Sequence, residues 1–215
     1  KSRMEKIVAD IIVDFSVKPR LKSQNGNAIL VASSIYEAAK YYNLFLNTEL
    51  KNKCAIITSY NPNASDVSLE DTGADNETDK EFIFKTYTEL LKNVSVKGNK
   101  SKTETYEADA KESFRKEPAR MKLLIVVSKL LTGFDAPPCT YIYIDKKMQD
   151  HTLFQAICRV NRLDTDDKDY GYIIDYMELF GNVTDAINVY TSELDSEGFT
   201  QEDVSIQLKD RLKIA

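Results

Sequence analysis

The stretch Leu123-Leu124-Ile125-Val126-Val127 is a continuous run of large apolar residues. Such a run is typical of a strand whose two faces are both buried, as in a parallel sheet covered by helices on each side. The sequence Ser128-Lys129-Leu130-Leu131-Thr132-Gly133-Phe134-Asp135-Ala136-Pro137-Pro138 follows at once, and its glycine and paired prolines interrupt regular structure. We therefore expect a central buried strand that ends in an irregular loop.

Short apolar runs and helical patterns alternate on both sides of this strand. Further strands are expected at residues 28–32, 55–58, 141–144 and 170–175. Apolar residues recur at intervals of three and four, as in amphipathic helices, over residues 4–15, 35–50, 83–94, 149–162 and 179–194. A helix with a weaker pattern is expected over 104–117, before Pro118. This alternation predicts an α/β domain with a mostly parallel sheet.

The composition is that of a globular protein of 215 residues, with 42% hydrophobic residues and a formal net charge of −5. The charge excludes a basic nucleic-acid coat protein, but it is compatible with a localised DNA-binding track. No apolar run has the length of a membrane span, and three scattered cysteines with one histidine argue against disulfides and metal clusters. We expect a cytoplasmic protein with no metal site of its own. The first residue is Lys1, which indicates a piece of a longer chain.

Changes in composition divide the chain into segments. We expect a helical N-terminal segment over residues 1–26, an α/β domain over 27–176 and further helices over 177–215. Within the α/β domain, residues 61–79 are rich in Asp and Glu and nearly free of large apolar residues, which predicts a solvated loop. Residues 80–118 are then expected to form a helical insertion.

Two serines follow the first expected strand. Ser33 and Ser34 stand where that strand meets a helix, and the free backbone N–H groups and dipole of a helix N-terminus favour a phosphate. Serine is also a preferred N-cap residue, so plain capping of the helix is the competing interpretation.

The loop after the central strand carries a second set of polar groups. Ser128 and Thr132 offer hydroxyls, and Gly133 allows a ligand to approach the backbone closely. Asp135 offers a carboxylate that can accept a hydrogen bond from a ribose hydroxyl. The alternative is an ordinary turn in which Asp135 bonds its own backbone.

A third set lies on the helix expected over 149–162. Gln155, Arg159 and Arg162 have an i, i+4, i+7 spacing and so share one face. Two neighbouring arginines repel each other unless an anion lies between them, and a guanidinium binds phosphate bidentately. Surface salt bridges to nearby aspartates are the alternative. An apolar stripe displaced by about 200° is expected to pack on the sheet: Leu153, Ile157 and Val160.

In their order and spacing, the three sets resemble motifs IV, V and VI of superfamily-2 helicases and translocases, which lie in the second RecA-like motor domain. The third set resembles the pattern Gln-x-x-Gly-Arg-x-x-Arg, with Cys158 where glycine is usual. Residues 131–137, 155–162 and 171–176 are most similar to the restriction (motor and nuclease) subunit of type I restriction–modification enzymes. The resemblance spans residues 4–194.

Features of a first motor domain are missing from the sequence. There is no G-x-x-x-x-G-K-[ST] phosphate loop, because Gly98-Asn99-Lys100-Ser101 lacks the framing glycine and a preceding strand. No acidic box follows a strand, and no convincing nuclease site is found. The resemblance therefore implies a second motor domain alone, with half of an ATP site that it shares with another domain.

The resemblance implies a three-layer RecA-like (P-loop NTPase-like) fold with extra helices. It implies that Arg162 is an arginine finger on the γ-phosphate of ATP and that Arg159 assists it. Gln155 is implied to contact the acidic motif of the first motor domain. Asp135, with Gly133 beside it, is implied at the nucleotide ribose or as a sensor of domain closure.

Four hydroxyl groups are implied at DNA phosphates, which position a strand without reading its bases: Ser33, Ser34, Ser128 and Thr132. ATP and Mg²⁺ are expected in the complete enzyme, and neither is expected to bind this chain tightly, so the chain alone should be inactive. The implied partners are double-stranded DNA, the first RecA-like and nuclease domains of the same chain, and the methyltransferase and specificity subunits. No membrane is implied.

Two other interpretations stay open at this point. One is a motor domain of a different superfamily-2 helicase, and the residues upstream of Lys1 would distinguish it. The other is a non-catalytic RecA-like or flavodoxin-like interaction module, in which Arg159 and Arg162 are ordinary surface residues pointing into solvent.

Overall fold

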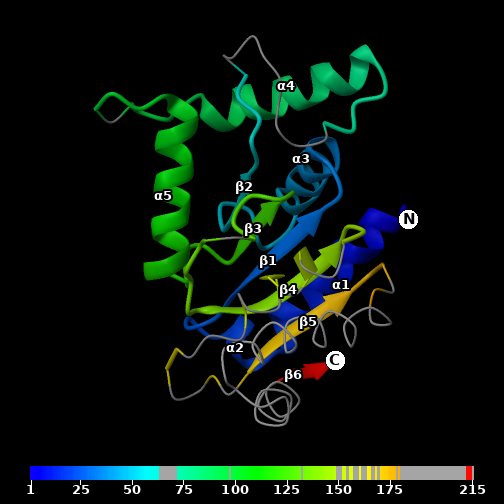
Figure 1. Cartoon of the computed structure of the whole chain (residues 1–215), viewed down its shortest axis with the longest axis vertical. Coiled ribbons are helices and arrows are strands. Elements are labelled where there is room, and N and C mark those ends of the chain that lie inside the picture. The colour runs from blue at the N-terminus through cyan, green and yellow to red at the C-terminus, as the bar shows by residue number, and fades with distance from the viewer. Residues whose placement is uncertain are drawn as a thin grey trace, which may run out of the picture.

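A parallel β-sheet runs through the centre of the computed structural model (Figure 1). The structure describes residues 1–62, 72–96, 98–131, 133–148, 152–153, 155–156, 160, 164–165, 168, 170–177, 179 and 212–214. Within these residues the sheet has six strands, in the order β2-β3-β1-β4-β5-β6. The strands are β1 (Asn27–Ala32), β2 (Cys54–Ile57), β3 (Leu123–Val126), β4 (Cys139–Asp145), β5 (Gly171–Asp175) and β6 (Leu212–Ile214).

The strands all run in the same direction, so their ends gather at two edges. Val31 near the end of the central strand β1 is paired with Val126 of β3 and with Ile144 of β4. We call the edge where strands end the carboxyl edge, and it includes Ala32, Ile57, Val126, Asp145 and Asp175. The edge where strands begin is the amino edge, and it includes Asn27, Cys54, Leu123, Cys139 and Gly171.

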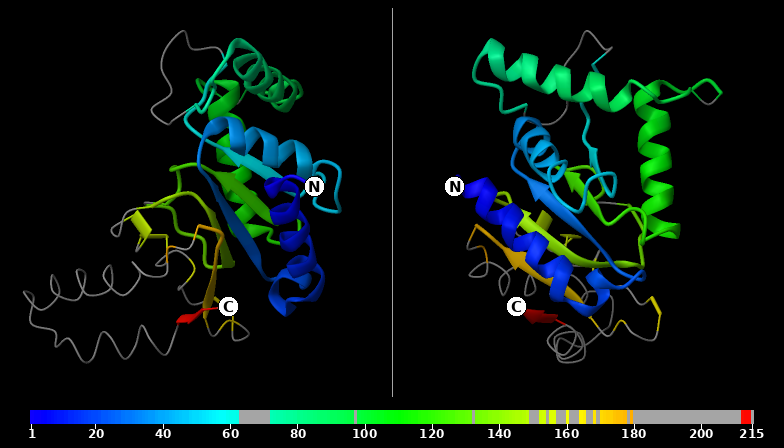
Figure 2. Two further views of the ribbon diagram at one scale, coloured as in Figure 1. Left: turned by 90° about the vertical axis from the view of Figure 1, so that its right-hand side faces the viewer. Right: turned by 180° about the vertical axis from the view of Figure 1, so that it is seen from behind.

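Helices cover both faces of the sheet, so the domain has three layers (Figure 2). One face packs against α1 (Arg3–Val17), α3 (Ile35–Phe45) and α4 (Glu77–Leu91). The other face packs against α5 (Lys102–Lys116) and against the helical residues 152–153, 155–156 and 160. Every residue of β1 to β4 is buried, which is why these strands appear as apolar runs. The predicted α/β domain with a mostly parallel, RecA-like sheet is confirmed.

Polar residues fix where the helices begin. Ser34 accepts a hydrogen bond of 3.2 Å from the backbone N–H of Glu37 and caps α3. Ser101 forms a capping box with Glu104 at the start of α5. The capping role predicted for the serine pair at α3 is thus confirmed for Ser34, and it satisfies N–H groups that a helix cannot satisfy internally.

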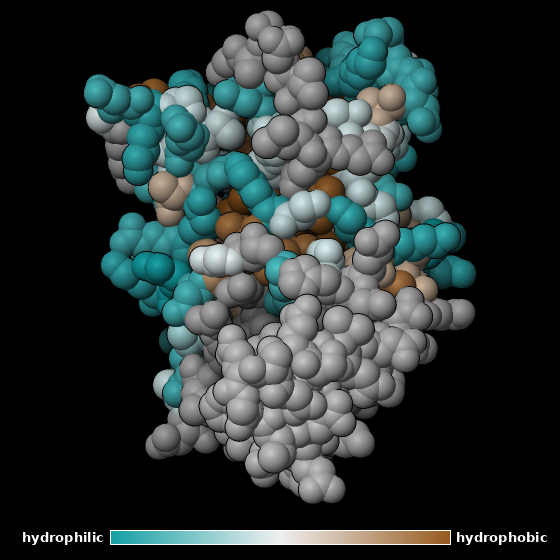
Figure 3. Space-filling view, in the orientation of Figure 1, coloured by the Kyte–Doolittle hydropathy of each residue, from teal (hydrophilic) through white to brown (hydrophobic). Residues whose placement is uncertain are grey.

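The predicted helical insertion consists of α4 and α5, which connect β2 to β3. α4 begins at Glu77, a few residues earlier than expected, because Asn76 caps it. The hydroxyl of Tyr106 in α5 accepts a hydrogen bond of 3.2 Å from the N–H of Ile56, so α5 covers part of the edge strand β2. The outer surface over α4 and α5 is mainly hydrophilic (Figure 3).

The segments near the two ends differ from the expectation in two ways. The short helix α2 (Pro19–Lys22), which leads into β1, is not predicted by the sequence pattern. Most of the segment 177–215, where helices are expected, lies outside the described residues, but residues 212–214 form β6 and pair in parallel with β5. Three residues are too few to show a periodic pattern. The expected domain boundaries at residues 26 and 176 stay predictions.

Candidate functional site

The first predicted site lies at the carboxyl edge, where β1 meets α3. The Ser33 hydroxyl donates to the backbone oxygen of Asp145 at 2.7 Å. Ser34 caps α3 and is only 6% exposed, and a Cβ on Gly73 would come within 2.3 Å of its Oγ. Both hydroxyls are therefore engaged within the protein, and their contact with DNA phosphates stays a prediction.

Asp145, the last residue of β4, is a buried carboxylate beside this site. It accepts hydrogen bonds from the Tyr41 hydroxyl and from the Arg3 guanidinium. The bond to Asp145 raises the pKa of Arg3, and burial together with the same carboxylate raises the pKa of Tyr41. This network ties α1 and α3 to the end of β4. Asp145 is not among the predicted residues, although a carboxylate that ends an apolar run is a visible signal.

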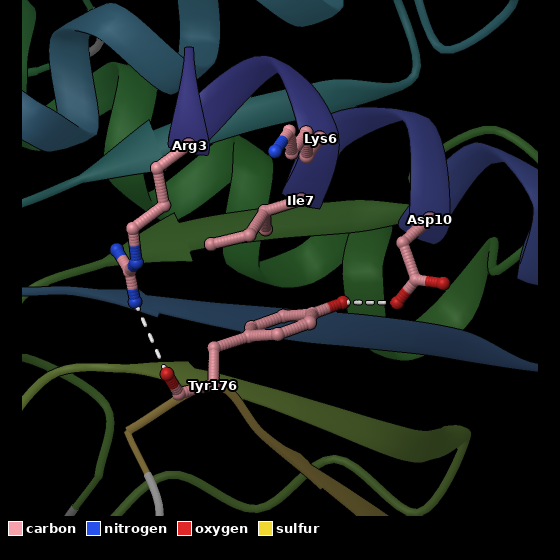
Figure 4. Close-up of a pocket in the computed structure, with 5 residues that line it drawn as sticks. All are labelled: Arg3, Lys6, Ile7, Asp10 and Tyr176. Atoms are coloured by element: carbon pink, nitrogen blue, oxygen red, sulfur yellow. Dashed lines mark hydrogen bonds between the residues drawn. The ribbon is translucent and has the colours of Figure 1, made fainter. Parts of the chain in front are cut away.

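A groove of about 520 Å³ follows the seam between α1 and the segment after β5 (Figure 4). It is lined by Arg3, Lys6, Ile7, Asp10 and Tyr176. The Tyr176 hydroxyl donates to Asp10 at 2.6 Å, and Arg3 donates to the backbone oxygen of Tyr176 at 3.1 Å. These hydrogen bonds across the groove connect α1 to the segment after β5. We assign no ligand to the groove.

The second predicted site begins at the carboxyl edge, after β3. The ammonium of Lys146 donates to Ser128 Oγ and to the backbone oxygen of Val127, each at 3.0 Å. Lys129 donates to the Glu107 carboxylate at 2.8 and 3.0 Å and to the backbone oxygen of Thr58 at 3.1 Å. Lys146 therefore contacts Ser128, whereas the ammonium of Lys129 binds Glu107 and Thr58. These contacts were not predicted because Lys146 and Glu107 come from distant parts of the sequence.

The loop then turns back across the face of the sheet that carries α5. Leu130 and Leu131 are buried in that face, whereas Gly133 and Asp135 are exposed. Leu130 has φ 71° and Gly133 has φ 69°, and a left-handed backbone is costly for leucine but not for glycine. The loop ends at the amino edge, where Cys139 N–H donates to the oxygen of Ala136 at 3.0 Å. Thr132 lies outside the described residues.

The third predicted site belongs to the helix expected over 149–162, which we call the arginine helix. Its described residues are helical, and Leu153 and Val160 are buried, as the predicted apolar stripe requires. Gln155 is half-buried. Val160 lies against Gly171 at the amino edge. Arg159 and Arg162 lie outside the described residues, as does Ile157.

Those predicted residues that the structure describes lie at more than one place. Ser33, Ser34 and Ser128 lie at the carboxyl edge. Gly133 and Asp135 belong to a loop that leads to the amino edge, where the described end of the arginine helix also lies. The binding roles predicted for all of these residues stay predictions.

Two further expectations concern a metal site and a membrane-spanning helix. Among the residues that the structure describes, no three or more His, Cys, Asp and Glu side chains converge in a way that could hold a metal ion. In the same residues, no helix is both long and apolar enough to cross a bilayer.

Comparisons with known proteins point to one family. A family model described as "Type I restriction enzyme subunit R domain 3" matches residues 24–178. The chain is 29% identical over 220 residues to the type I restriction enzyme HindI endonuclease subunit of Haemophilus influenzae, covering 99% of this chain and 18% of that one. It is 28% identical over 182 residues to the type I restriction enzyme SauCOLORF180P endonuclease subunit of Staphylococcus aureus, covering 82% and 19%.

The chain thus spans less than a fifth of the length of these two relatives. One solved structure, the DNA-bound ATP-dependent type ISP restriction-modification enzyme LlaBIII, aligns with 98% of this chain and 16% of its own, at 12% identity. Its TM-score is 0.33, and a likeness at that level carries no argument.

Proposed function

This chain belongs to the family described as type I restriction enzyme subunit R domain 3, and from that premise we propose that it is the second RecA-like motor domain of such an enzyme. In this role it moves the enzyme along double-stranded DNA at the expense of ATP. The nuclease and the first motor domain lie elsewhere in the longer protein. Methyltransferase and specificity subunits complete the proposed complex, and the domain alone is inactive.

One loop supports this proposal more than any other feature. At the carboxyl edge the hydroxyl of its first residue, Ser128, accepts a hydrogen bond from Lys146, and its next residue, Lys129, is paired with Glu107. Farther on, Gly133 and Asp135 are exposed as the loop approaches the amino edge. A loop that contacts a DNA phosphate at one end and the nucleotide at the other couples the two ligands through one short segment.

On the DNA side, we propose that Ser33, Ser34, Ser128 and Thr132 contact backbone phosphates, with Lys129 and Lys146 adding charge. The side chain of Lys129 is 41% exposed, so part of its charge faces water and can meet a phosphate while its ion pair with the buried Glu107 is kept. Contacts to phosphates carry no sequence information, which suits a motor that must travel over any sequence. The formal net charge of −5 does not oppose such a local track.

On the nucleotide side, we propose that Arg162 reaches the γ-phosphate of ATP in the cleft between the two motor domains, with Arg159 beside it. Gln155 contacts the acidic motif of the first domain, and Asp135 approaches the ribose next to Gly133. An arginine finger contributes roughly 10³–10⁵ to the rate, because it compensates the charge that develops on the transferring phosphoryl group. Mg²⁺ neutralises phosphate charge in such sites, and the described residues of this chain offer it no ligand cluster, so its ligands are assigned to the first domain.

The test uses the complete restriction subunit. Arg162→Ala is expected to abolish DNA-stimulated ATP hydrolysis while DNA binding, measured by fluorescence anisotropy, survives. The matched control is Arg120→Ala, because Arg120 is an exposed arginine whose guanidinium pairs with Glu117 on the surface. Normal turnover in the Arg162 variant would contradict the assignment.

A further inference from the structure

Three contacts at the amino edge hold Val160 of the arginine helix and the described residues that follow it, which are Asp164, Thr165 and Lys168. Gly171 receives the backbone of Val160, Arg20 binds Asp164 and Thr165, and Lys168 binds the start of β4. We call Arg20, Lys168 and Gly171 the amino-edge clamp. Arg20 and Lys168 lie outside the stretches that carry the family resemblance, whereas Gly171 begins one of them.

Gly171 allows the helix to approach the sheet. A Cβ at this position would lie 2.3 Å from the backbone oxygen of Val160 and 2.4 Å from its carbonyl carbon. Backbone atoms cannot give way as the end of a flexible side chain can. Any side chain at residue 171 therefore displaces Val160 from β5.

Arg20 is a buried cation whose donors converge on the same segment. Its guanidinium donates to Asp164 at 2.5 Å and to the Thr165 hydroxyl at 3.1 Å. It also donates to the Thr140 hydroxyl at 3.0 Å and to the backbone oxygen of Asn25 at 3.1 Å. The side chains of Arg20 and Asp164 are only 8% and 17% exposed. A buried, multiply bonded arginine has one preferred position, so whatever it binds is fixed with it.

Lys168 joins this segment to the loop that carries Asp135. Its ammonium donates to the backbone oxygen of Pro137 at 2.6 Å and to that of Cys139 at 2.8 Å. The residue is 4% exposed. Lys168 therefore holds the end of the loop that carries Asp135 against the residues that follow the arginine helix in the sequence.

We propose that Arg20 is a positioning residue for ATP turnover: it holds Asp164 and Thr165, which follow Arg162 by two and three residues in the sequence, and acts through them on the arginines proposed to contact ATP. The inference rests on the proposed function. In the sequence, Arg159 immediately precedes Val160, and Arg162 lies two residues before Asp164. Arg162 thus lies between two residues that the clamp holds, and Arg159 is next to one of them. A displacement of about 1 Å at a reacting centre can lower a rate by about 10²-fold.

The experiment compares conservative variants in the complete restriction subunit, with kcat normalised to the folded fraction. Arg20→Lys keeps the charge but loses the planar fork, and Asp164→Asn keeps the shape but loses the charge. For both, kcat for ATP is expected to fall by about 10- to 100-fold with KM for ATP within about twofold, because only the transition-state contact is misplaced. Arg120→Lys, at an exposed pair, is the matched control and is expected to match the wild type.

The outcomes separate this inference from the proposed function. If Arg162→Ala abolishes turnover while Arg20→Lys and Asp164→Asn keep wild-type kcat per folded molecule, the positioning role is wrong and the motor assignment stands. If Arg162→Ala keeps its turnover, the proposed function itself fails. A loss of activity that only follows the loss of folded protein would assign Arg20 a purely structural role and overturn the inference.

Discussion

The two edges of the sheet hold their positive charges in opposite ways. At the carboxyl edge, Lys129 is partly exposed and Lys146 half-buried. Lys146 donates to Ser128, which is exposed, whereas Lys129 is paired with the buried carboxylate of Glu107. At the amino edge, Arg20 is 7% and Lys168 4% exposed. An exposed cation can exchange its partner for a phosphate at little cost, whereas a buried one cannot leave its partners without an unpaired charge. The carboxyl edge is therefore suited to bind, and the amino edge to position.

The largest expected difference between the edges is in stability. Arg20→Met leaves Asp164 without its buried partner and should lower the free energy of unfolding by about 3 kcal/mol. Lys146→Met, at the carboxyl edge, removes hydrogen bonds to neutral acceptors and should cost about 1 kcal/mol. Urea unfolding of the two variants, at equal slopes, measures both values. An equal loss of unfolding free energy in the two variants would contradict the proposed difference between the edges.

The next largest expected effect on stability comes from replacing Gly171, with Gly98 as the control. Gly171→Ala places a methyl group against the backbone of Val160 and should destabilise the domain by about 2 kcal/mol. Gly98→Ala is the control, because nothing lies within 4 Å of its Cβ position and the only cost is its φ of 62°. That strain costs about 1 kcal/mol. Thermal unfolding compares the stability of the two variants. A Gly171→Ala variant as stable as the wild type would show that Val160 of the arginine helix does not pack against β5.

The carboxyl edge makes a separate prediction about DNA. In the complete subunit, Lys146→Met is expected to reduce the dependence of DNA affinity on salt by about one unit in the logarithmic slope, equally for any sequence. Lys116→Met is the matched control, since Lys116 lies on the exposed side of α5 and pairs with Glu112. A titration at several salt concentrations measures the slope. An unchanged slope for Lys146→Met would remove Lys146 from the proposed track.

These expectations differ in how far the sequence alone supports them. The strands and helices could be predicted, because apolar periodicity and serine caps such as Ser34 are local properties of the chain. The partners of Ser128 and Asp164 could not, because Lys146 is 18 and Arg20 is 144 residues away from them. The separation of the serines from Gly133 and Asp135 could not be predicted either, because it depends on a loop that crosses from one edge to the other.

The smallest expected effect is the pH dependence of stability at the amino edge. Burial lowers the pKa of Lys168 from 10.5 to about 8, and burial of Cys139 keeps its thiol protonated by raising its pKa to about 12. Between pH 8 and 10.5 the unfolded chain therefore binds more protons at Lys168 than the folded chain does, so Lys168 makes stability rise with pH there. The raised pKa of Cys139 acts in the opposite direction above pH 9. Lys122, whose pKa burial also lowers to about 8, acts in the same direction as Lys168.

Replacing Lys168 tests this directly. Between pH 8 and pH 9.5, below the ionisation of unfolded tyrosines, Lys168→Met should lessen the rise in the free energy of unfolding by about 1 kcal/mol. Urea unfolding at a series of pH values measures the difference. An identical rise in the variant and the wild type would show that Lys168 does not release its proton in this range.

The central claim is that one domain uses its carboxyl edge for DNA and its amino edge for the position of the arginines that act on ATP. The most direct measurement is a DNA titration of ATP hydrolysis by the complete subunit carrying Lys146→Met or Arg20→Lys. The account predicts that Lys146→Met raises the DNA concentration for half-maximal stimulation, and that Arg20→Lys lowers kcat at saturating DNA without changing that concentration. If Arg20→Lys instead raises the half-saturating DNA concentration and leaves kcat as in the wild type, the division between the edges is wrong.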